Sequence, residues 1–441
     1  MRGLHHPESS RGADVADDHI ARDLGPSIPH DCRHGHESRT QAPFGKVAFI
    51  TTADSTHYPS SRAAETEAPR LPSRYPFVEA LRDRGVHVSV QTLAALSKDR
   101  RGARAPGSWI SYAHVPSLVK RLRESDIIIA TSTHGAVLAN LAALTGGWNR
   151  KLLILSFTNQ TPDTSFFARK IRSVLYRAAL RRCGALLLMT QRHIKEAITV
   201  FGCKEARVHY FPVGVDTRYF VPHPKDAAAR IRPELRAMPE GSYVVVAGDQ
   251  LRDEVQLAAL IGQLKVGLVR LTQNIYTERF WEHWTSDGAC RVPVFCKAHL
   301  RWEEVRYAYQ NGLCLLNIVD NSWQPAGWTV VTEAMACGLP VVVRRGLVTE
   351  EMRRHVAQGE QAAFLETDGT NFVEILGLIE MLANCREERE KMGRQARRFV
   401  ESHFCIENTA EAVFRVICQM TEAHGARRAV SAEDGVWGLH G

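Results

Sequence analysis

Residues 313–345 read LCLLNIVDNSWQPAGWTVVTEAMACGLPVVVRR, and this stretch decides the fold class. It opens with a near-continuous apolar run, and a second such run begins at Leu339. Runs of this kind are typical of strands that are buried on both faces of a parallel sheet. Between them the pattern predicts a helix from about Thr329 to Cys337, which Gly338 ends. A strand, a helix and a second strand in this order form the unit of an α/β fold.

The same rhythm extends from this stretch in both directions. Helix-length segments such as Arg74–Arg84 and Ala136–Leu144 separate the apolar runs, and three helical patterns occupy residues 372–421. We therefore expect an α/β protein with two Rossmann-like doubly wound domains. The remaining runs are KVAFITT at 46, VHVSVQT at 86, DIIIATS at 126, KLLILSF at 151, GALLLMT at 184, RVHYFPVG at 207, SYVVVAGD at 242, KVGLVRLT at 265, RVPVFCK at 291 and AAFLET at 362.

A break in this rhythm sets the domain boundary. Residues 222–240 carry four prolines and interrupt the alternation. We place a first domain at 45–222 and a second at 223–421. Residues 1–44 contain six histidines among Ser, Gly, Asp and Arg without sustained periodicity, so they are expected to be a disordered tail. Residues 422–441 are expected to be a frayed C-terminal tail.

Composition excludes several classes of protein. No apolar run reaches membrane-spanning length and no signal-peptide core opens the chain, so the protein is expected to be soluble and cytoplasmic. The ten cysteines form no C-x-x-C pair, and no D-x-D element follows a strand in a loop, so no metal is expected. No G-x-G-x-x-G fingerprint follows a first strand, which argues against a dinucleotide-dependent oxidoreductase.

The charge is divided unevenly between the two domains. Residues 45–222 carry 26 basic and 12 acidic side chains, a balance of +14, whereas residues 223–441 carry 25 and 29, a balance of −4. A basic first domain indicates an anionic partner, either an acidic acceptor molecule or a membrane surface, with an ordinary solvated basic face as the alternative. A helical pattern at 166–184 with six basic residues fits a lipid-linked acceptor or peripheral membrane contact, or again a solvated face. No nucleic-acid partner is expected.

The loop before the predicted helix has the features of an anion site. The backbone N–H groups at a helix start are free to bind a diphosphate, which places Gly327, Trp328 and Thr329 at the ligand. Glu333 follows about one turn later, where a carboxylate could accept both hydroxyls of a ribose. The alternative for Glu333 is an exposed helix residue.

The segment TEAMACGLPVVV, at 332–343, resembles the donor-site signature of GT-B-fold glycosyltransferases of the family-4 (group 1) type. The resemblance implies two Rossmann-like domains that face each other across a cleft, with a nucleotide-sugar donor held by the second domain. It implies that Glu333 binds the ribose. The glutamate that contacts the sugar in this family falls on Pro325 here, so Asp320, Gln324 or backbone groups of the 326–328 loop are expected to replace it.

Two further segments match the same family. PVGVDTRYFVP, at 212–222, resembles the segment that ends the first domain. In AGDQLRDEVQL, at 247–257, Arg252 aligns with a phosphate-binding lysine, and an arginine can grip a phosphate through two hydrogen bonds. The alternative for Arg252 is a surface ion pair with Asp253 or Glu254.

The first domain offers candidates for catalysis and acceptor binding. Asp54, His57 and Arg62 follow the strand KVAFITT, and His134 follows DIIIATS. Ligands of open α/β sheets bind beyond the carboxyl ends of strands, so we name Asp54, His57 and His134 as catalytic candidates, against a reading as ordinary loop residues.

The pattern as a whole predicts a glycosyltransferase of the hexosyltransferase type that acts with retention, without metal and without a cofactor other than its nucleotide-sugar substrate. Two other hypotheses remain at this point: a non-catalytic GT-B protein that binds a ligand or partner, and a nucleotide-sugar isomerase. The donor base and sugar have no readable code, although the base is expected near Lys297–Leu300.

Overall fold

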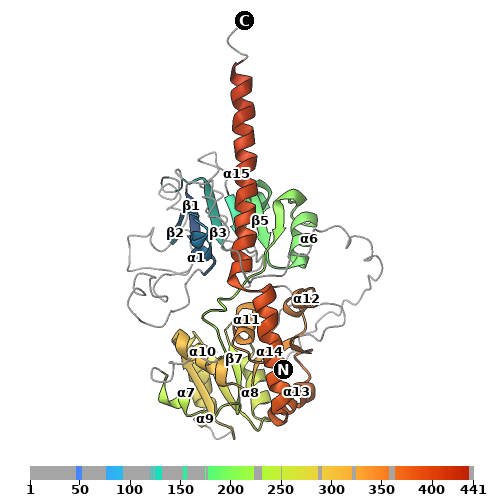
Figure 1. Cartoon of the computed structure of the whole chain (residues 1–441). Helices are drawn as coiled ribbons and strands as arrows, with labels where there is room; N and C mark the ends of the chain where they lie inside the picture. The colour runs from blue at the N-terminus through green and yellow to red at the C-terminus, as the bar shows by residue number, and fades with distance from the viewer. Residues whose placement is uncertain are drawn as a thin grey trace, which may run out of the picture. The chain divides into compact units, whose positions relative to one another are not determined.

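Two parallel six-stranded sheets organise the chain in the computed structural model (Figure 1). The structure describes residues 46–51, 76–92, 120, 122, 125–131, 152–155, 174, 177–222, 231–249, 251–286, 291–319, 324–356 and 363–436. All strand neighbours whose register is described run parallel. The α/β class and the two doubly wound sheets predicted from the sequence are confirmed.

The first sheet has the strand order β2-β1-β3-β4-β5-β6. Each strand falls within one of the apolar runs identified in the sequence. The order reverses direction between β1 and β3, which is where doubly wound sheets bind ligands. The elements of this part are β1 (Val47–Thr51), α1 (Pro76–Asp83), β2 (Val88–Thr92), β3 (Ile127–Thr131), β4 (Leu152–Leu155), β5 (Ala185–Leu188), α6 (Gln191–Thr199), the short 3-10 helix η5 (Glu205–Arg207) and β6 (Val208–Tyr210).

The second sheet has the order β12-β11-β10-β7-β8-β9 and reverses direction between β7 and β10. Helices alternate with its strands along the chain, as parallel connections require. The elements that follow along the chain are α7 (Pro233–Arg236), β7 (Tyr243–Ala247), α8 (Glu254–Ile261), β8 (Gly267–Thr272), α9 (Ile275–Ser286), β9 (Val294–Ala298), α10 (Trp302–Asn311), β10 (Cys314–Asn317), α11 (Trp328–Ala336), β11 (Val341–Arg344), α12 (Leu347–Arg353), β12 (Leu365–Thr367), α13 (Phe372–Asn384), α14 (Arg386–His403) and α15 (Ile406–Val436).

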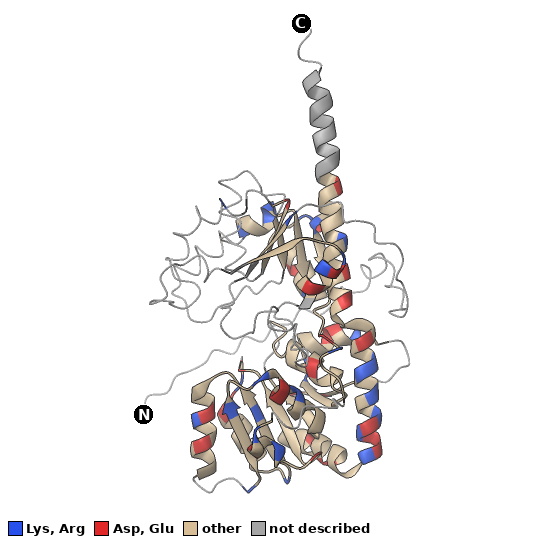
Figure 2. Cartoon of the chain, turned by 60° about the vertical axis from the view of Figure 1, so that its left-hand side comes forward, with Lys and Arg blue, Asp and Glu red and all other residues tan. Residues whose placement is uncertain are grey.

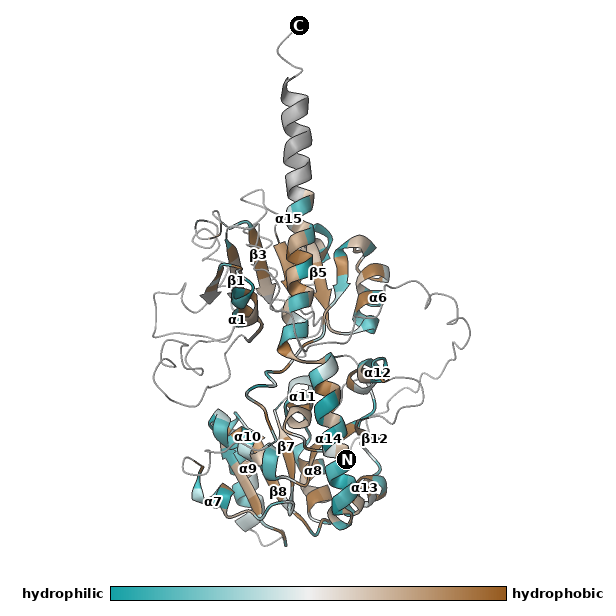
Figure 3. Cartoon of the chain, in the orientation of Figure 1, coloured by the Kyte–Doolittle hydropathy of each residue, from teal (hydrophilic) through white to brown (hydrophobic). Residues whose placement is uncertain are grey.

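The strands form the cores because both of their faces are apolar. Charged residues lie mostly on the helices (Figure 2), and the central strands of both sheets are strongly hydrophobic (Figure 3). The central strands β4, β5, β7, β8 and β10 are buried at every position. A polar residue inside such a strand therefore needs a reason, and three are present in the second sheet: Arg270 and Thr272 in β8 and Asn317 at the end of β10.

The last helix returns to the first sheet. Val413, Val416, Ile417 and Met420 of α15 are buried in the core cluster that includes β1, β3, β4 and β5. The helix continues to Val436, beyond residue 421, where the sequence analysis placed a frayed tail. Residues 426–434 contain Ala, Arg and Glu and no proline, which permits this continuation. Among the described residues, no helix combines the length and apolarity needed to cross a membrane.

The segment 212–222 is a strap held by side chains of later elements. Arg397 donates to the carbonyls of Thr217 and Phe220, Arg306 donates to that of Tyr219, and Gln310 donates to that of Val221. The indole N–H of Trp328 donates to the Val213 carbonyl at 2.8 Å. These bonds satisfy the backbone of an irregular segment and fix its course.

Candidate donor site

The candidate site lies where β7 and β10 end side by side. These adjacent strands flank the point at which the order of the second sheet reverses. In open α/β sheets ligands bind beyond the carboxyl ends of the strands at such a point. The loop after β7 leads to Arg252, and the loop after β10 leads to the start of α11. The two sequence segments selected for donor binding therefore meet at one edge of one sheet.

Arg252 bridges the two strand ends. Its Nε donates to the Gly248 carbonyl at 2.7 Å, and one terminal nitrogen donates both to the Ala247 carbonyl and to Asn317 Oδ1, the latter at 3.1 Å. Among the described residues no carboxylate forms an ion pair with it, so the alternative of a surface ion pair with Asp253 or Glu254 is not found. Burial, with the nearby charge of Arg270, lowers the pKa of Arg252 to about 9. A half-buried cation without an ion-pair partner among the described residues is well placed to receive an anion.

Asn317 is the polar residue that closes β10, and it is completely buried. Its Oδ1 accepts from Arg252, but no described residue accepts a hydrogen bond from its Nδ2. A buried amide donor without a partner costs free energy, of the order of 1–3 kcal/mol. The sequence analysis did not select Asn317, although a polar residue at the end of an otherwise apolar strand was a usable signal.

The start of α11 supplies further donors. Gly327 precedes the helix with φ +82°, a conformation that favours glycine, and a Cβ on it would lie 2.4 Å from the Asn317 side chain. Pro325 and Gln324 lie in the preceding turn. Among the described residues, none accepts from the backbone N–H groups of Thr329 or Val330. Thr329 is exposed, so these donors face an accessible region.

The side chain of Trp328 has a structural role, whereas the sequence analysis proposed a ligand contact for its backbone. Its side chain is buried, and its indole binds the strap at Val213 and packs edge-on against Phe404, with ring centroids 5.1 Å apart. It therefore anchors the first turn of α11, and only its backbone lies at the ligand-binding edge.

Glu333 is buried, with 6% of its surface exposed. The Tyr309 hydroxyl donates to its Oε2 at 3.3 Å. Burial raises the pKa of Glu333 to about 8, so the carboxyl is mostly protonated at neutral pH. Its role as a ribose contact, and the roles of the other predicted donor-site residues, stay predictions.

A buried ionic network supports the loop after β7. Arg270 of β8 is fully buried and pairs with Glu254 at 2.6 Å and with Asp249 at 3.2 Å. Trp281 donates to Glu254 at 2.8 Å. The charge-assisted bonds of this network hold Asp249 and Glu254 on either side of Arg252 in the chain.

Two strained residues lie on the same edge of the sheet. Leu251 has φ +53° and His299, just after β9, has φ +56°. Residues other than glycine rarely adopt this backbone conformation, and such strain concentrates at functional sites. His299 Nδ1 lies 3.2 Å from Gln273 Oε1, so the loops after β8 and β9 are joined. This is the region 297–300 in which the base was expected.

The first-domain candidates and one donor-site candidate lie outside the described residues. These are Asp54, His57 and Arg62 after β1, His134 after β3 and Asp320 after β10. The described residues contain no group of three or more His, Cys, Asp or Glu side chains that could hold a metal.

With this geometry in place, the chain is a GT-B-fold protein. Comparisons with known proteins agree with this assignment. Residues 245–415 match the family model described as "Glycosyl transferase-like". No curated protein sequence matches the chain. The resemblance to group 1 glycosyltransferases predicted from TEAMACGLPVVV is confirmed.

Solved structures share the whole fold. HepE of Anabaena, solved in complex with UDP-glucose, is 15% identical with a TM-score of 0.56, over 86% of this chain and 99% of its own. WaaG, a glycosyltransferase involved in lipopolysaccharide biosynthesis, is 12% identical with a TM-score of 0.53, over 84% and 99%. A glycosyltransferase from Rickettsia africae is 10% identical with a TM-score of 0.53, over 86% and 99%. At these identities the likeness concerns the fold.

Proposed function

We propose that this protein is a glycosyltransferase that holds a nucleoside-diphosphate sugar where β7 and β10 end. The observation that carries the proposal is Asn317 Nδ2, a buried donor without an acceptor among the described residues, beside Arg252 and the start of α11. A diphosphate supplies both the missing acceptor and the missing negative charge. The UDP-glucose complex of HepE, which has the same fold, supports this choice of ligand.

The donor would be bound by three kinds of group. The N–H groups of Thr329 and Val330, with the positive end of the α11 dipole, would bind phosphate oxygens. Asn317 would donate one hydrogen bond, and Arg252 would supply positive charge from beneath. Pro325 leaves no carboxylate for the sugar at its position, so the sugar hydroxyls would bind Gln324, Asp320 or the backbone of the 326–328 loop.

Glu333 would bind the ribose only after leaving Tyr309. In the structure Tyr309 holds the carboxyl, and both side chains are buried. A ribose that offers two hydroxyls to the carboxylate would replace the single bond from Tyr309 and favour the ionised form.

The reaction would break the bond between the anomeric carbon and the diphosphate oxygen and form a bond from that carbon to an acceptor oxygen. The electron pair of the broken bond stays on the diphosphate, and the acceptor proton passes to a diphosphate oxygen. Arg252 and the α11 dipole stabilise the charge that develops, so the residues at this edge require no metal for the step. We propose retention and a hexosyl group from the family resemblance.

The acceptor would bind the first domain. Its balance of 26 basic to 12 acidic residues favours an anionic or lipid-linked acceptor and a cytoplasmic enzyme in peripheral contact with a membrane. Asp54, His57 and His134 follow β1 and β3, the strands at which the first sheet reverses order. They are proposed as catalytic residues on this ground.

A binding screen tests the donor site. We expect UDP, GDP, ADP or TDP, or a sugar conjugate of one of them, to raise the Tm of the full chain. We expect Asn317→Ala to weaken that ligand at least tenfold by calorimetry. Asn384→Ala, an exposed asparagine at the end of α13, serves as the control and should bind normally. No shift with any of these nucleotides, or equal binding by Asn317→Ala, would reject the donor site.

Nuclear magnetic resonance of the bound donor separates the competing functions. Incubated without acceptor, a transferase gives the donor unchanged or slowly hydrolysed. A new nucleotide sugar would identify an isomerase. A donor that is neither hydrolysed nor, in separate incubations, transferred to any acceptor would identify a non-catalytic binding protein.

A further inference from the structure

A cavity lies at the opposite edge of the second sheet. It has a volume of about 800 Å³ and is bordered by residues that precede strands: Glu240 before β7, Gly312 before β10 and Pro340 before β11. The candidate donor site is where β7 and β10 end, so the two places are separated by the length of the strands. Pro222, at the end of the strap, also borders this cavity.

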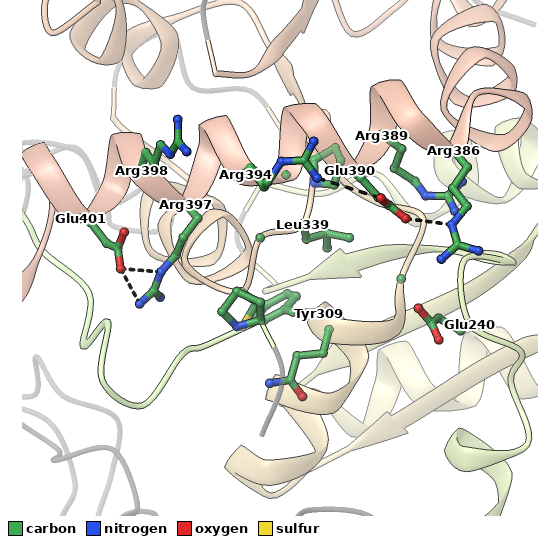
Figure 4. Close-up of a pocket in the computed structure, with 17 residues that line it drawn as sticks. Glu240, Tyr309, Leu339, Arg386, Arg389, Glu390, Arg394, Arg397, Arg398 and Glu401 are labelled. Carbon is green, nitrogen blue, oxygen red and sulfur yellow. Dashed lines mark hydrogen bonds and ion pairs between the residues drawn. The ribbon is translucent and has the colours of Figure 1, made fainter. Parts of the chain in front are cut away.

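One face of α14 forms the wall of the cavity. Figure 4 shows five arginines that project from this helix, with Tyr309 and Leu339 of other elements beside them. Arg386 and Arg389 are three residues apart, and Arg394 is three and four residues from Arg397 and Arg398, so the five lie within one half of the helix circumference. The arginines are Arg386, Arg389, Arg394, Arg397 and Arg398.

A glycine in the middle of this face shapes the cavity. Gly393 packs so closely on the end of α11 that a Cβ would lie 2.1 Å from the Gly338 carbonyl oxygen. The backbones therefore touch there, while the longer arginine side chains on either side stand above the junction. The cavity thus combines an apolar and backbone floor with a cationic wall.

The lining of the cavity has a net positive charge. Three glutamates face five arginines, which leaves a balance of +2, although residues 223–441 as a whole have a balance of −4. Glu390 is shared between Arg386 at 2.8 Å and Arg394 at 3.9 Å (Figure 4). Arg397 is paired with Glu401. No described carboxylate forms an ion pair with Arg389 or Arg398.

We propose that this cavity binds a small molecule with several phosphate groups. Guanidinium groups bind phosphate oxygens through paired hydrogen bonds, and the volume lies within the range of about 300–1,000 Å³ that is usual for ligand pockets. None of the residues proposed to contact the donor borders this cavity, although Tyr309, which holds Glu333, does border it.

The recessed floor favours a small molecule over a membrane. Cys337 and Leu339 border the cavity and are buried, so a ligand that reaches them must enter between the arginines. A lipid surface would meet only the exposed outer guanidinium groups, such as that of Arg386, whose side chain is 81% exposed. The depth of the lining therefore decides between the two sources of phosphate.

Calorimetry with inorganic tripolyphosphate tests the proposal. The full chain carries Asn317→Ala in this experiment, so that the proposed donor site does not contribute. We expect one binding event, weakened at least tenfold by the added pair Arg386→Gln and Arg394→Gln. Both arginines are exposed, so the variant should fold normally.

Arg415→Gln is the matched control, since Arg415 is an exposed helical arginine that also pairs with a glutamate four residues earlier. It should leave tripolyphosphate binding unchanged. Equal affinity in the paired variant and in the control would overturn the proposal. Binding to vesicles of phosphatidylglycerol that depends on Arg386 and Arg394, without binding of tripolyphosphate, would overturn it in favour of a membrane surface. Failure of nucleotide binding in the unaltered chain affects only the donor site.

Discussion

The two edges of the second sheet hold arginines in opposite ways. Where β7 and β10 end, Arg252 is held by two backbone carbonyls and by Asn317, and burial lowers its pKa to about 9. At the other edge, Arg386, Arg394 and Arg398 of α14 are exposed, and the first two share Glu390. The first arrangement is part of the packed structure, whereas the second is a charged surface around a cavity.

This difference separates the two kinds of ligand contact. A buried cation has lost its water, so a change there alters both folding and binding. An exposed cation keeps its water and contributes little to stability, so a change there alters binding alone. Substitutions at the two edges should therefore fall into distinct classes.

Replacement of Arg252 is expected to have the largest effect. Arg252→Ala removes the bridge between β7 and β10 and leaves the Ala247 and Gly248 carbonyls without this donor, at a cost of about 3 kcal/mol. The midpoint of urea unfolding should fall accordingly. Arg252→Lys should recover only part of it, because an ammonium lacks the planar fork.

The control at the opposite edge is Arg398→Ala, at an exposed position of α14. It should change the unfolding free energy by less than about 0.5 kcal/mol. The contrast between the edges fails if both alanine variants unfold at the same urea concentration.

The twelve strands of the described residues all overlap runs named from the sequence, because most of them are apolar along their length. VVVA in β7 and LLIL in β4 are apolar at every position, which is typical of strands that are buried on both faces of a parallel sheet. The helix α11 was also predicted to within one residue at each end, since Gly327 and Gly338 bracket it.

The candidate site was less predictable, because its key contacts depend on which strands are neighbours. Arg252 was selected through its segment, but its partner Asn317 is 65 residues away, and only the order β10-β7-β8 brings them together. Periodicity could not show that Glu333 faces Tyr309 or that Trp328 binds the strap. Those contacts follow from how α10, α11 and residues 212–222 pack.

An intermediate effect is expected from Glu333, a buried acid at neither edge. Its pKa in the folded protein is about 8 against an ordinary value of 4.5, so the folded state binds more protons between these values. Stability must then fall as pH rises from 5 to 9. Glu333→Gln lacks this proton loss, and its Tm relative to wild type should rise over that range by on the order of 5 °C.

Scanning calorimetry at pH 5, 7 and 9 measures this change. Glu380→Gln, an exposed position on α13, should follow the wild type at each pH. A constant difference between Glu333→Gln and wild type at all three values would mean that the carboxyl is already ionised in the folded protein.

The smallest change in stability is expected at Glu390, and it gives the sharpest view of the cavity. Glu390 is exposed and neutralises Arg386 and Arg394, so Glu390→Gln should leave the Tm within about 1 °C of wild type. The same change raises the net charge of the lining from +2 to +3, so it should strengthen tripolyphosphate binding about two- to fivefold at low salt. This gain should be lost at high salt, because salt screens the charges.

An acid whose removal strengthens ligand binding cannot be a contact that the ligand needs. Weaker binding in this variant would instead mean that Glu390 orients the arginines, and the cavity would then resemble the candidate donor site in depending on fixed geometry.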